Sequence, residues 1–288
     1  MSRVIVTGAS GFIGAKVVGS LRRSGYDVIP ADRDLGDVAD VAFWNSLPPA
    51  QHVIHLAGRS YVPDSWKTPA EFYATNVVGV ARATEYCRRT QAHLLFVSSY
   101  VYGTPRYLPI DEDHPLAPGS PYALSKVMAE QVCAFHAEAE HLAVTIVRPF
   151  NIFGPGQRTE FLIPAVIDQV RRGVEIRVKD LGPRRDYLFI DDLAAGLERS
   201  LHSPEGLRVF NLGSGSSYSV QEVIDLAQAV AGTRLGVHCE EALRQNEIAD
   251  VRANIARART QLGWNPGVSL RDGIAWMFGL SNTEYFSG

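Results

Sequence analysis

Short, mostly apolar runs alternate with longer helical patterns along the first half of this 288-residue chain. The runs, at residues 4–6, 28–29, 53–56, 94–97 and 144–147, are not interrupted by regularly spaced polar residues, as expected for strands covered on both faces. Between them, apolar side chains recur at helical spacing, as with Ile13, Val17 and Leu21, and a second clear helical pattern covers 122–139. This alternation predicts an α/β fold built on a doubly wound parallel sheet.

The pattern changes after Pro149, where the sequence Gly154-Pro155-Gly156 predicts a loop and the later segments are less regular. We therefore predict a first domain at residues 1–150 and a smaller C-terminal α/β lobe at 151–288 that binds substrate. An apolar run at 209–213 has the character of a further strand. We expect the chain to return to the first domain through such a strand within residues 186–215.

Composition excludes several classes of protein. The formal charge of −3 and the pI near 6.2 give no electrostatic reason to expect a nucleic-acid partner. The three cysteines are far apart and the histidines form no metal-binding pair, so we expect neither a metal site nor a disulfide framework. No stretch approaches the 18 or so apolar residues that a membrane span requires. We expect a cytoplasmic protein without a membrane partner.

A glycine-rich segment, TGASGFIG at residues 7–14, follows the first predicted strand and opens the first predicted helix. Gly8, Gly11 and Gly14 would permit a tight turn, close approach of the backbone to a pyrophosphate, and close packing of helix on sheet. The positive end of the helix would then face the anion. The spacing is GxxGxxG, and a plain tight turn is the alternative interpretation. The setting between strand and helix favours a Rossmann-like dinucleotide site.

Asp32 comes just after the second predicted strand, where such folds place an acceptor for a ribose hydroxyl. A simple turn aspartate is the alternative. A carboxylate here disfavours the 2′-phosphate of NADP, whereas the neighbouring Arg33 could accept it. We predict NAD as the cofactor, with NADP as the alternative.

Tyr122 and Lys126 lie one helical turn apart on one face of a predicted helix. A nearby cation favours the phenolate and would lower the tyrosine pKa from about 10, which would make Tyr122 a usable acid and base. The pair follows a predicted strand that ends at Ser98 and Ser99, and ligands bind at the carboxyl edge of such sheets. We predict a reacting centre there.

At these residues the sequence resembles the extended short-chain dehydrogenase/reductase family, and within it the NAD-dependent sugar epimerases and dehydratases. The resemblance covers nearly the whole chain. Its motifs are TGASGFIG at 7–14, HLAG at 55–58, NVVG at 76–79, SSYVYG at 98–103, SPYALSK at 120–126, RPFNIFGPGQ at 148–157, RRDYLFIDDLA at 184–194, NLGSG at 211–215 and LGWNP at 262–266.

The resemblance implies roles for individual residues around the cofactor. Tyr122 and Lys126 match the catalytic pair, and Lys126 would also bond the nicotinamide ribose. Asp37 and Val38 would lie beside adenine, and Leu56, Ala57 and Asn76 would form the wall on the nicotinamide side. The full set implied to bind the cofactor is Gly8, Gly11, Phe12, Ile13, Gly14, Asp32, Asp37, Val38, Leu56, Ala57, Asn76, Tyr122, Lys126 and Phe150.

The resemblance also implies a catalytic hydroxyl and a set of substrate contacts. The catalytic Ser or Thr of the family lies three residues before the Val of VYG, which selects Ser98; Ser99 is its rival, and we expect Ser99 to point away from the reacting atoms. The residues implied to contact a nucleotide-sugar substrate are Ser99, Asn151, Arg185, Arg244 and Glu247, of which the arginines would bind its diphosphate. Ordinary surface charges are the alternative for the late residues of this set.

Three reactions share this apparatus. The 4,6-dehydratases carry two carboxylates just before VYG, whereas this chain has Ser99 and Tyr100 there, which argues against water loss. We predict an NAD-dependent nucleotide-sugar 4-epimerase. The alternative is an NAD(P)H-dependent reductase of nucleotide-linked 4-keto-6-deoxyhexoses, since only four residues separate Asp32 from Asp37 and a helix after the second strand is expected to be lost, as in compact reductases.

A third interpretation is a cofactor-binding regulator without catalysis, which the intact Ser98, Tyr122 and Lys126 argue against. By analogy with the family, we also expect a homodimer formed through helices flanking residues 70–90 and 122–140.

Overall fold

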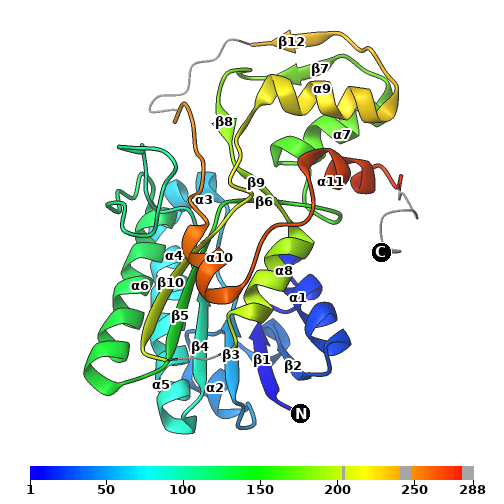
Figure 1. The fold of residues 1–288 in the computed structure, drawn as a ribbon. Helices are drawn as coiled ribbons and strands as arrows, with labels where there is room; N and C mark the ends of the chain where they lie inside the picture. The colour runs from blue at the N-terminus through cyan, green and yellow to red at the C-terminus, as the bar shows by residue number, and fades with distance from the viewer. Residues whose placement is uncertain (203–204, 241–247, 281–288) are drawn as a thin grey trace.

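The computed structural model describes residues 1–202, 205–240 and 248–280, and six parallel strands form the central sheet of this described part (Figure 1). Their order across the sheet is β10-β5-β4-β3-β1-β2, and each neighbouring pair runs parallel. The predicted doubly wound parallel sheet is therefore confirmed. The strands are β1 (Arg3–Thr7), β2 (Asp27–Ala31), β3 (His52–His55), β4 (His93–Val97), β5 (Val144–Pro149) and β10 (Leu207–Leu212).

Helices cover both faces of this sheet, which explains why its strands are apolar on both sides. One face packs on α1 (Phe12–Arg23), α8 (Ile190–Arg199) and α10 (Ala256–Leu262). The other face packs on α2 (Val41–Asn45), α5 (Gly79–Thr90) and α6 (Pro121–Glu140). Alternate residues of β4 serve the two cores, with Leu95 in the first and Phe96 in the second. Each such side chain contributes about 1.5–3 kcal/mol on burial.

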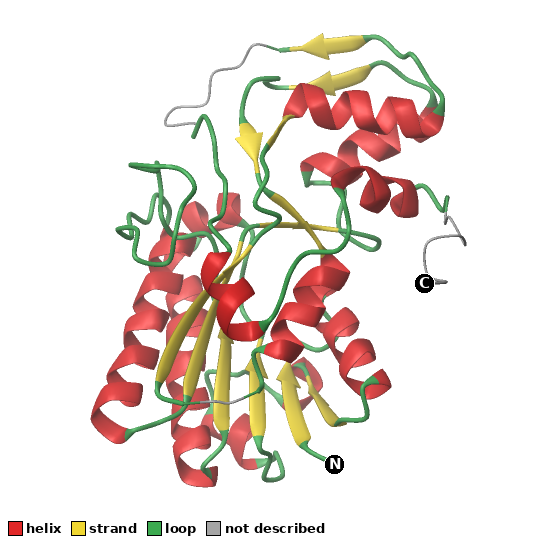
Figure 2. Cartoon of the chain, in the orientation of Figure 1, coloured by secondary structure: helices red, strands yellow, loops and turns green. Residues whose placement is uncertain are grey.

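The remaining elements form a smaller lobe beyond the carboxyl edge of the sheet (Figure 2). Its helices share an apolar core with three short strand pairs, β6–β9, β7–β12 and β8–β11. The elements are β6 (Asn151–Phe153), α7 (Leu162–Arg172), β7 (Ile176–Val178), β8 (Arg184–Arg185), β9 (Tyr187–Phe189), β11 (Tyr218–Ser219), α9 (Val220–Ala231), β12 (Val237–Cys239) and α11 (Leu270–Met277).

The chain returns from this lobe to the sheet through α8 and β10. All six residues of β10 pair in parallel with β5, from Leu207 opposite Val144 to Leu212 opposite Pro149. The apolar run at 209–213 therefore does return to the first domain, as its composition indicated. The second half of the chain consequently contributes an outer strand of the sheet that carries the site.

The connection between β2 and β3 is short, but it is not free of helix. It holds the 3-10 turn η1 (Arg33–Leu35) and α2, a helix of five residues. The helix expected to be lost would have stood between Asp32 and Asp37, where the described chain holds only η1, so this expectation is confirmed. Beyond Asp37 the chain forms the single helical turn α2. Phe43 and Trp44 of this turn are buried, and the Trp44 indole donates a hydrogen bond to the Val38 carbonyl at 2.8 Å.

Three short elements connect β3 to α5. They are α3 (Val62–Lys67), α4 (Pro69–Tyr73) and the π-helical turn η2 (Ala74–Val78), which continues directly into α5. A π-helical turn adds one residue to the turn of an α-helix. Asn76 lies in this turn and is buried.

The first turn after β1 is closed by backbone packing. Gly8 has φ +67°, and a Cβ there would lie 2.9 Å from the Ala57 nitrogen. A Cβ on Gly14 would lie 2.1 Å from the Gly8 oxygen, well inside any real contact. Helix α1 thus packs directly on the glycine-rich turn, and the turn packs directly on the residues that follow β3.

We expect Gly14→Ala to lower the free energy of unfolding by about 1–3 kcal/mol, because the added methyl group forces α1 off the turn. Urea denaturation measures this quantity. Gly19→Ala is the matched control in the same helix, since its Cβ would meet only the flexible end of Arg23 at 3.5 Å. We expect that control to be neutral or to stabilise by up to about 1 kcal/mol. Equal effects of the two substitutions would contradict direct packing of α1 on the turn.

Candidate active site

The N-terminus of α1 is open toward the carboxyl edge of the sheet. Gly11 is its N-cap, and within the described chain no side chain caps it and no acidic residue lies in its first turn. The first N–H groups of the helix, at Phe12 and Ile13, therefore point with the helix dipole toward an anion. Together with the backbone packing at Gly8 and Gly14, this cradle fits the pyrophosphate of a dinucleotide.

Asp32 lies beside this cradle at the end of β2. Its Oδ1 accepts hydrogen bonds from the backbone nitrogen and the hydroxyl of Ser10, both at 3.0 Å. One carboxylate oxygen thus fixes the glycine-rich turn, and the carboxylate can still accept a ribose hydroxyl. Asp37 and Val38 follow along the same edge, and Val38 is buried against Gly79.

The residues after β3 form the floor between the cradle and α6. The Thr7 hydroxyl accepts from the Ala57 nitrogen at 3.2 Å and pairs with Nδ1 of His55 at 2.9 Å. Burial, followed by the charge of Lys126, lowers the pKa of His55 to about 3, so His55 is neutral at neutral pH. Leu56 lies between His55 and Ala57 and packs partly on the core of the α1 face.

Asn76 supports this floor and does not offer its amide to a ligand. Its Nδ2 donates to the Arg59 carbonyl at 3.0 Å and to the Ser125 hydroxyl at 2.9 Å, and its Oδ1 accepts from the Arg59 nitrogen at 2.8 Å. Both donors are therefore committed to the protein. Asn76 thus ties the segment after β3 to α6, and its place in the cofactor wall stays a prediction.

Helix α6 carries the expected reacting pair. The Ser120 hydroxyl caps the helix by accepting from the Ala123 nitrogen at 3.1 Å, and Pro121 sets its first residue. Lys126 is buried, donates from Nζ to the Val97 carbonyl at 2.9 Å and lies 4.8 Å from the centre of the Phe96 ring. Burial lowers the pKa of Lys126 to about 8, while the Glu130 carboxylate opposes this change. The ammonium is thus fixed below the end of β4.

The pKa of Tyr122 differs from the expectation. Burial raises it above its ordinary value, and a hydrogen-bonding contact with the Ser99 side chain offsets part of that effect. The expected lowering of the Tyr122 pKa by the cation is therefore wrong, because loss of solvent around the phenol outweighs the field of the Lys126 ammonium, which donates to the Val97 carbonyl.

The two serines at the end of β4 take opposite directions. Ser98 is buried, and its hydroxyl donates to Glu130 Oε1 at 2.5 Å on the inner face of α6. Ser99 is half-buried and lies within hydrogen-bonding reach of the Tyr122 phenol. The geometry thus brings Ser99 to the phenol, contrary to the expectation that Ser99 points away, while the assignment of the catalytic hydroxyl to Ser98 stays a prediction.

Aromatic residues line the side toward the small lobe. Tyr100 stands where dehydratases carry a carboxylate, and its ring meets Phe150 edge-on at 5.5 Å between centroids. Arg185 lies close enough to lower the pKa of Tyr100, although burial is the larger cause and raises it to about 12. The Asn151 amide donates to the Asp186 carbonyl at 3.1 Å, so its nitrogen is held within the lobe.

Arg185 is anchored at the base of the lobe. Its Nη1 donates to the carbonyls of Arg184 at 2.8 Å and Ile248 at 2.6 Å. The other two expected diphosphate contacts, Arg244 and Glu247, lie outside the described residues.

Sequence reasoning missed a buried polar network behind the reacting pair. Glu130 and Arg148 form an ion pair at 2.6 Å, with side chains only 5% and 7% exposed. The signal was present in the sequence: Glu130 lies one helical turn after Lys126, and Arg148 interrupts an otherwise apolar strand.

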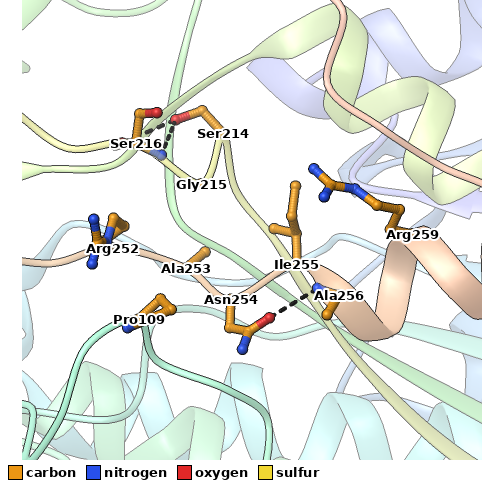
Figure 3. Close-up of a pocket in the computed structure, with 10 residues that line it drawn as sticks. All are labelled: Pro109, Ser214, Gly215, Ser216, Arg252, Ala253, Asn254, Ile255, Ala256 and Arg259. Carbon is orange, nitrogen blue, oxygen red and sulfur yellow. Dashed lines mark hydrogen bonds between the residues drawn. The ribbon is translucent and has the colours of Figure 1, made fainter.

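Two of the cavities in the described part of the structure concern the site. One of about 480 Å³ includes Ser10, Gly11 and Phe12 and therefore adjoins the cradle. The other, of about 490 Å³, includes none of the expected site residues (Figure 3). In this second cavity the Ser214 hydroxyl and the Asn254 side-chain oxygen accept hydrogen bonds from nearby backbone nitrogens. Arg252 and Arg259 lie on opposite sides of Ile255 in Figure 3. We assign the site to the cradle and the α6 edge, where the titratable groups gather.

Two further findings concern the described residues. Among them, no group of three or more His, Cys, Asp or Glu side chains is arranged to hold a metal ion. None of their helices has the length and apolar character needed to cross a bilayer.

Comparisons with known proteins agree with this geometry. The sequence model of the NAD dependent epimerase/dehydratase family matches residues 4–213. The chain is 32% identical to the GDP-6-deoxy-D-mannose reductase of Pseudomonas aeruginosa over 94% of both chains. It is also 32% identical to the UDP-glucose 4-epimerase of Corynebacterium glutamicum, over 92% of this chain and 91% of that one.

Solved structures show the same likeness. RMD from Pseudomonas aeruginosa complexed with NADPH superposes with a TM-score of 0.89 at 29% identity, covering 97% of this chain and 98% of that one. MoeE5 in complex with UDP-glucose and NAD superposes with a TM-score of 0.89 at 30% identity, covering 96% and 98%.

The opposite directions of Ser98 and Ser99 are testable without a substrate. We expect Ser98→Ala to lower the free energy of unfolding by about 1.5–3 kcal/mol, the usual contribution of a buried hydrogen bond to a charged group. We expect Ser99→Ala to be less destabilising and to raise the pKa of Tyr122. Urea denaturation measures the first effect, and the ¹³Cζ signal of Tyr122, identified by its loss in Tyr122→Phe, measures the second. A raised Tyr122 pKa in Ser98→Ala alone would contradict the assignment.

Proposed function

Because the chain belongs to the NAD-dependent epimerase/dehydratase family and is an NAD(P)-dependent enzyme of the epimerase/reductase type, we propose that it is a nucleotide-sugar 4-epimerase. In this proposal it inverts the carbinol carbon C4 of a nucleoside-diphosphate hexose and retains NAD throughout. The UDP-glucose 4-epimerases among its relatives support the substrate class.

One observation favours the epimerase over a reductase that consumes NADPH. The Asp32 carboxylate stands at the end of β2 beside the glycine-rich turn, held there by Ser10. A 2′-phosphate at that place would meet a like charge, whereas a free ribose hydroxyl would find an acceptor. NAD is the cofactor that a self-contained oxidation and reduction of one sugar requires.

The residues at the edge of the sheet can perform this chemistry. Bound NAD supplies an acceptor and later a donor of hydride. Tyr122 takes the proton of the 4-hydroxyl and returns it after the ketosugar has turned over. Ser99 donates a hydrogen bond at the same oxygen, and Lys126 provides the positive field that stabilises the phenolate as the proton moves. Tyr100 offers no carboxylate, so the site lacks the acid and base for water loss.

The substrate fits between this edge and the small lobe. Arg185, anchored by two carbonyls, supports binding of the diphosphate, because a fixed guanidinium matches phosphate oxygens in two places. Phe150 directly follows β5 and Asn151 opens β6, and in this proposal they border the sugar. Arg244 and Glu247 remain in the proposal as further contacts of the diphosphate and ribose.

A second candidate is a reductase of nucleotide-linked 4-keto-6-deoxyhexoses. The compact connection after β2 favours it, because η1 and α2 are all that remain there. The GDP-6-deoxy-D-mannose reductase and the NADPH-bound RMD, both from Pseudomonas aeruginosa, support it as well. Arg33 next to Asp32 could then contact the 2′-phosphate. The chemistry at Tyr122 would be the second half of the epimerase reaction.

The retained nucleotide separates the two candidates. We expect purified protein, once denatured, to release close to one NAD per chain, because an epimerase regenerates its cofactor in place. We also expect it to interconvert the 4-epimers of a nucleoside-diphosphate hexose with no added cofactor. An empty site together with NADPH consumption on a 4-ketosugar would overturn the epimerase and support the reductase. Chromatography of the supernatant and of the sugar products measures both.

Tyr122→Phe is the control for catalysis in the same experiment. It should release as much nucleotide as the native protein while turnover falls at least about 100-fold, the usual loss for removal of an acid/base group. Turnover that survives in this variant would contradict the role of Tyr122, and absence of any turnover in the native protein would favour a cofactor-binding regulator.

We further propose that the protein forms a homodimer through α5 and α6. Leu124, Met128 and Phe135 are 39%, 37% and 64% exposed and are spaced so that they share one face of α6. Val78, 42% exposed, precedes α5 on the same side of the sheet. A row of large apolar side chains on the neighbouring helices is typical of an interface between protein chains.

Phe135→Glu should convert such a dimer into a monomer, because two buried carboxylates would face one another across a twofold interface. Sedimentation at several protein concentrations measures the mass. Phe161→Glu, at an exposed apolar position of the small lobe, serves as the control and should leave the mass unchanged. A native protein that sediments as a monomer at all concentrations would refute the dimer.

A further inference from the structure

Glu130 is a buried carboxylate that the chemistry above does not use. It lies one helical turn beyond Lys126 on the inner face of α6 and is 5% exposed. Its Oε1 accepts from the Ser98 hydroxyl at 2.5 Å and from Arg148 Nε at 3.0 Å, and its Oε2 accepts from Arg148 Nη2 at 2.6 Å. Both oxygens of this carboxylate are therefore fixed by charge-assisted hydrogen bonds.

Its partner Arg148 is held by further hydrogen bonds on its other side. Arg148 Nη1 donates to the Tyr102 hydroxyl at 2.9 Å and to the Glu112 carbonyl at 3.1 Å. The Tyr102 hydroxyl in turn donates to Asn211 Oδ1 at 2.6 Å. The guanidinium is thus held by β5, by β10 and by the segment between β4 and α6. The Glu130 carboxylate that it binds is therefore held in place as well.

Moving the two charges of a buried ion pair out of water costs free energy. Apolar side chains of similar volume often give equal or greater stability. Stability therefore does not explain its position. Its position does matter for the reacting pair, because Glu130 is hydrogen-bonded to the residue before Ser99 and lies next to Lys126 along the helix.

The groups that face Lys126 in the described structure carry little other charge. His55 on β3 is neutral, since burial lowers its pKa to about 3. Cys133, a further turn along α6, is kept as the thiol because burial raises its pKa. Tyr122 is kept as the phenol for the same reason. Arg148 on β5 is paired with Glu130. Glu130 is thus the anion that the structure places behind the ammonium.

We propose that Glu130 is a positioning residue for the reaction: its carboxylate keeps Lys126 in the ammonium form, and its hydrogen bond to Ser98 fixes the end of β4 so that Ser99 faces Tyr122. The functional meaning of this inference rests on the proposed roles of Tyr122 and Lys126. The effect on the charge of Lys126 can be measured without any substrate.

The chain has four lysines, Lys16, Lys67, Lys126 and Lys179, so ¹³Cε-labelled lysine gives a spectrum simple enough to titrate each side chain. Lys126→Arg identifies the Lys126 signal. In Glu130→Gln, which keeps the shape and an acceptor for Ser98, we expect the titration midpoint of Lys126 to fall by about one to two pH units, the effect of one nearby opposite charge. The ammonium is then lost at a lower pH than in the native protein.

Glu138→Gln is the matched control, since Glu138 is exposed on the same helix and should leave the Lys126 midpoint unchanged. Glu130→Asp keeps the charge but withdraws it by one methylene, so its midpoint should lie between those of the native protein and Glu130→Gln. Should Glu130→Gln fail to fold, Glu130→Asp with an unchanged midpoint overturns the proposal. An unchanged midpoint in folded Glu130→Gln overturns it directly.

Turnover gives the second readout. We expect the alkaline limb of the kcat profile to move to lower pH in Glu130→Gln by the same amount as the Lys126 midpoint, with KM little changed. A uniform fall in kcat at every pH would indicate a purely structural role and overturn the proposal. If the protein turns over no nucleotide sugar, the proposed function fails, while the lysine titration still decides the inference about Glu130.

Discussion

The ion pair between Glu130 and Arg148 joins α6, the helix of the reacting pair, to strand β5 of the sheet. Two charges buried to this degree are tolerated only when each of their polar atoms is satisfied. Their partners come from the segment that follows β4, and Tyr102 of that segment is itself bonded to Asn211 of β10. The network therefore reaches the outer strand contributed by the second half of the chain.

A second buried carboxylate organises the join between sheet and small lobe. Asp186 accepts hydrogen bonds from the backbone nitrogens of Ser214 at 2.6 Å, Gly215 at 3.0 Å and Ala253 at 3.0 Å. Its own carbonyl accepts from the Asn151 amide. The segments that leave β5, β9 and β10 are thereby tied at one point, directly after Arg185. The lobe that would hold a diphosphate is consequently fixed relative to the edge that carries Tyr122.

Much of the fold could be predicted from the sequence, because hydrophobic periodicity and the glycine residues of tight turns are local features. Mostly apolar runs identified five of the strands, and the run at 209–213 identified β10 without indicating which strand it joins. The glycine-rich turn was predictable because Gly8 and Gly14 are required by contacts within a few residues or with the adjacent strand end. Pairings such as Glu130 with Arg148, or Tyr102 with Asn211, join residues 18 and 109 positions apart. No local pattern encodes them, and only the fold brings them together.

The directions of the Ser98 and Ser99 side chains show what strand geometry adds to counting along a motif. Position relative to Val101 selected Ser98, but the direction of a side chain is set by its distance from the last paired residue of the strand. Leu94 and Phe96 pack on the α6 side of the sheet, whereas Leu95 and Val97 pack on the other. With a period of two, Ser98 continues the first set and meets Glu130 on α6. Ser99 follows one position later and lies within hydrogen-bonding reach of the Tyr122 phenol. The parity of Ser98 with Phe96 was visible in the sequence and predicts the side of the sheet that Ser98 faces, whereas the choice of the catalytic hydroxyl stays a prediction.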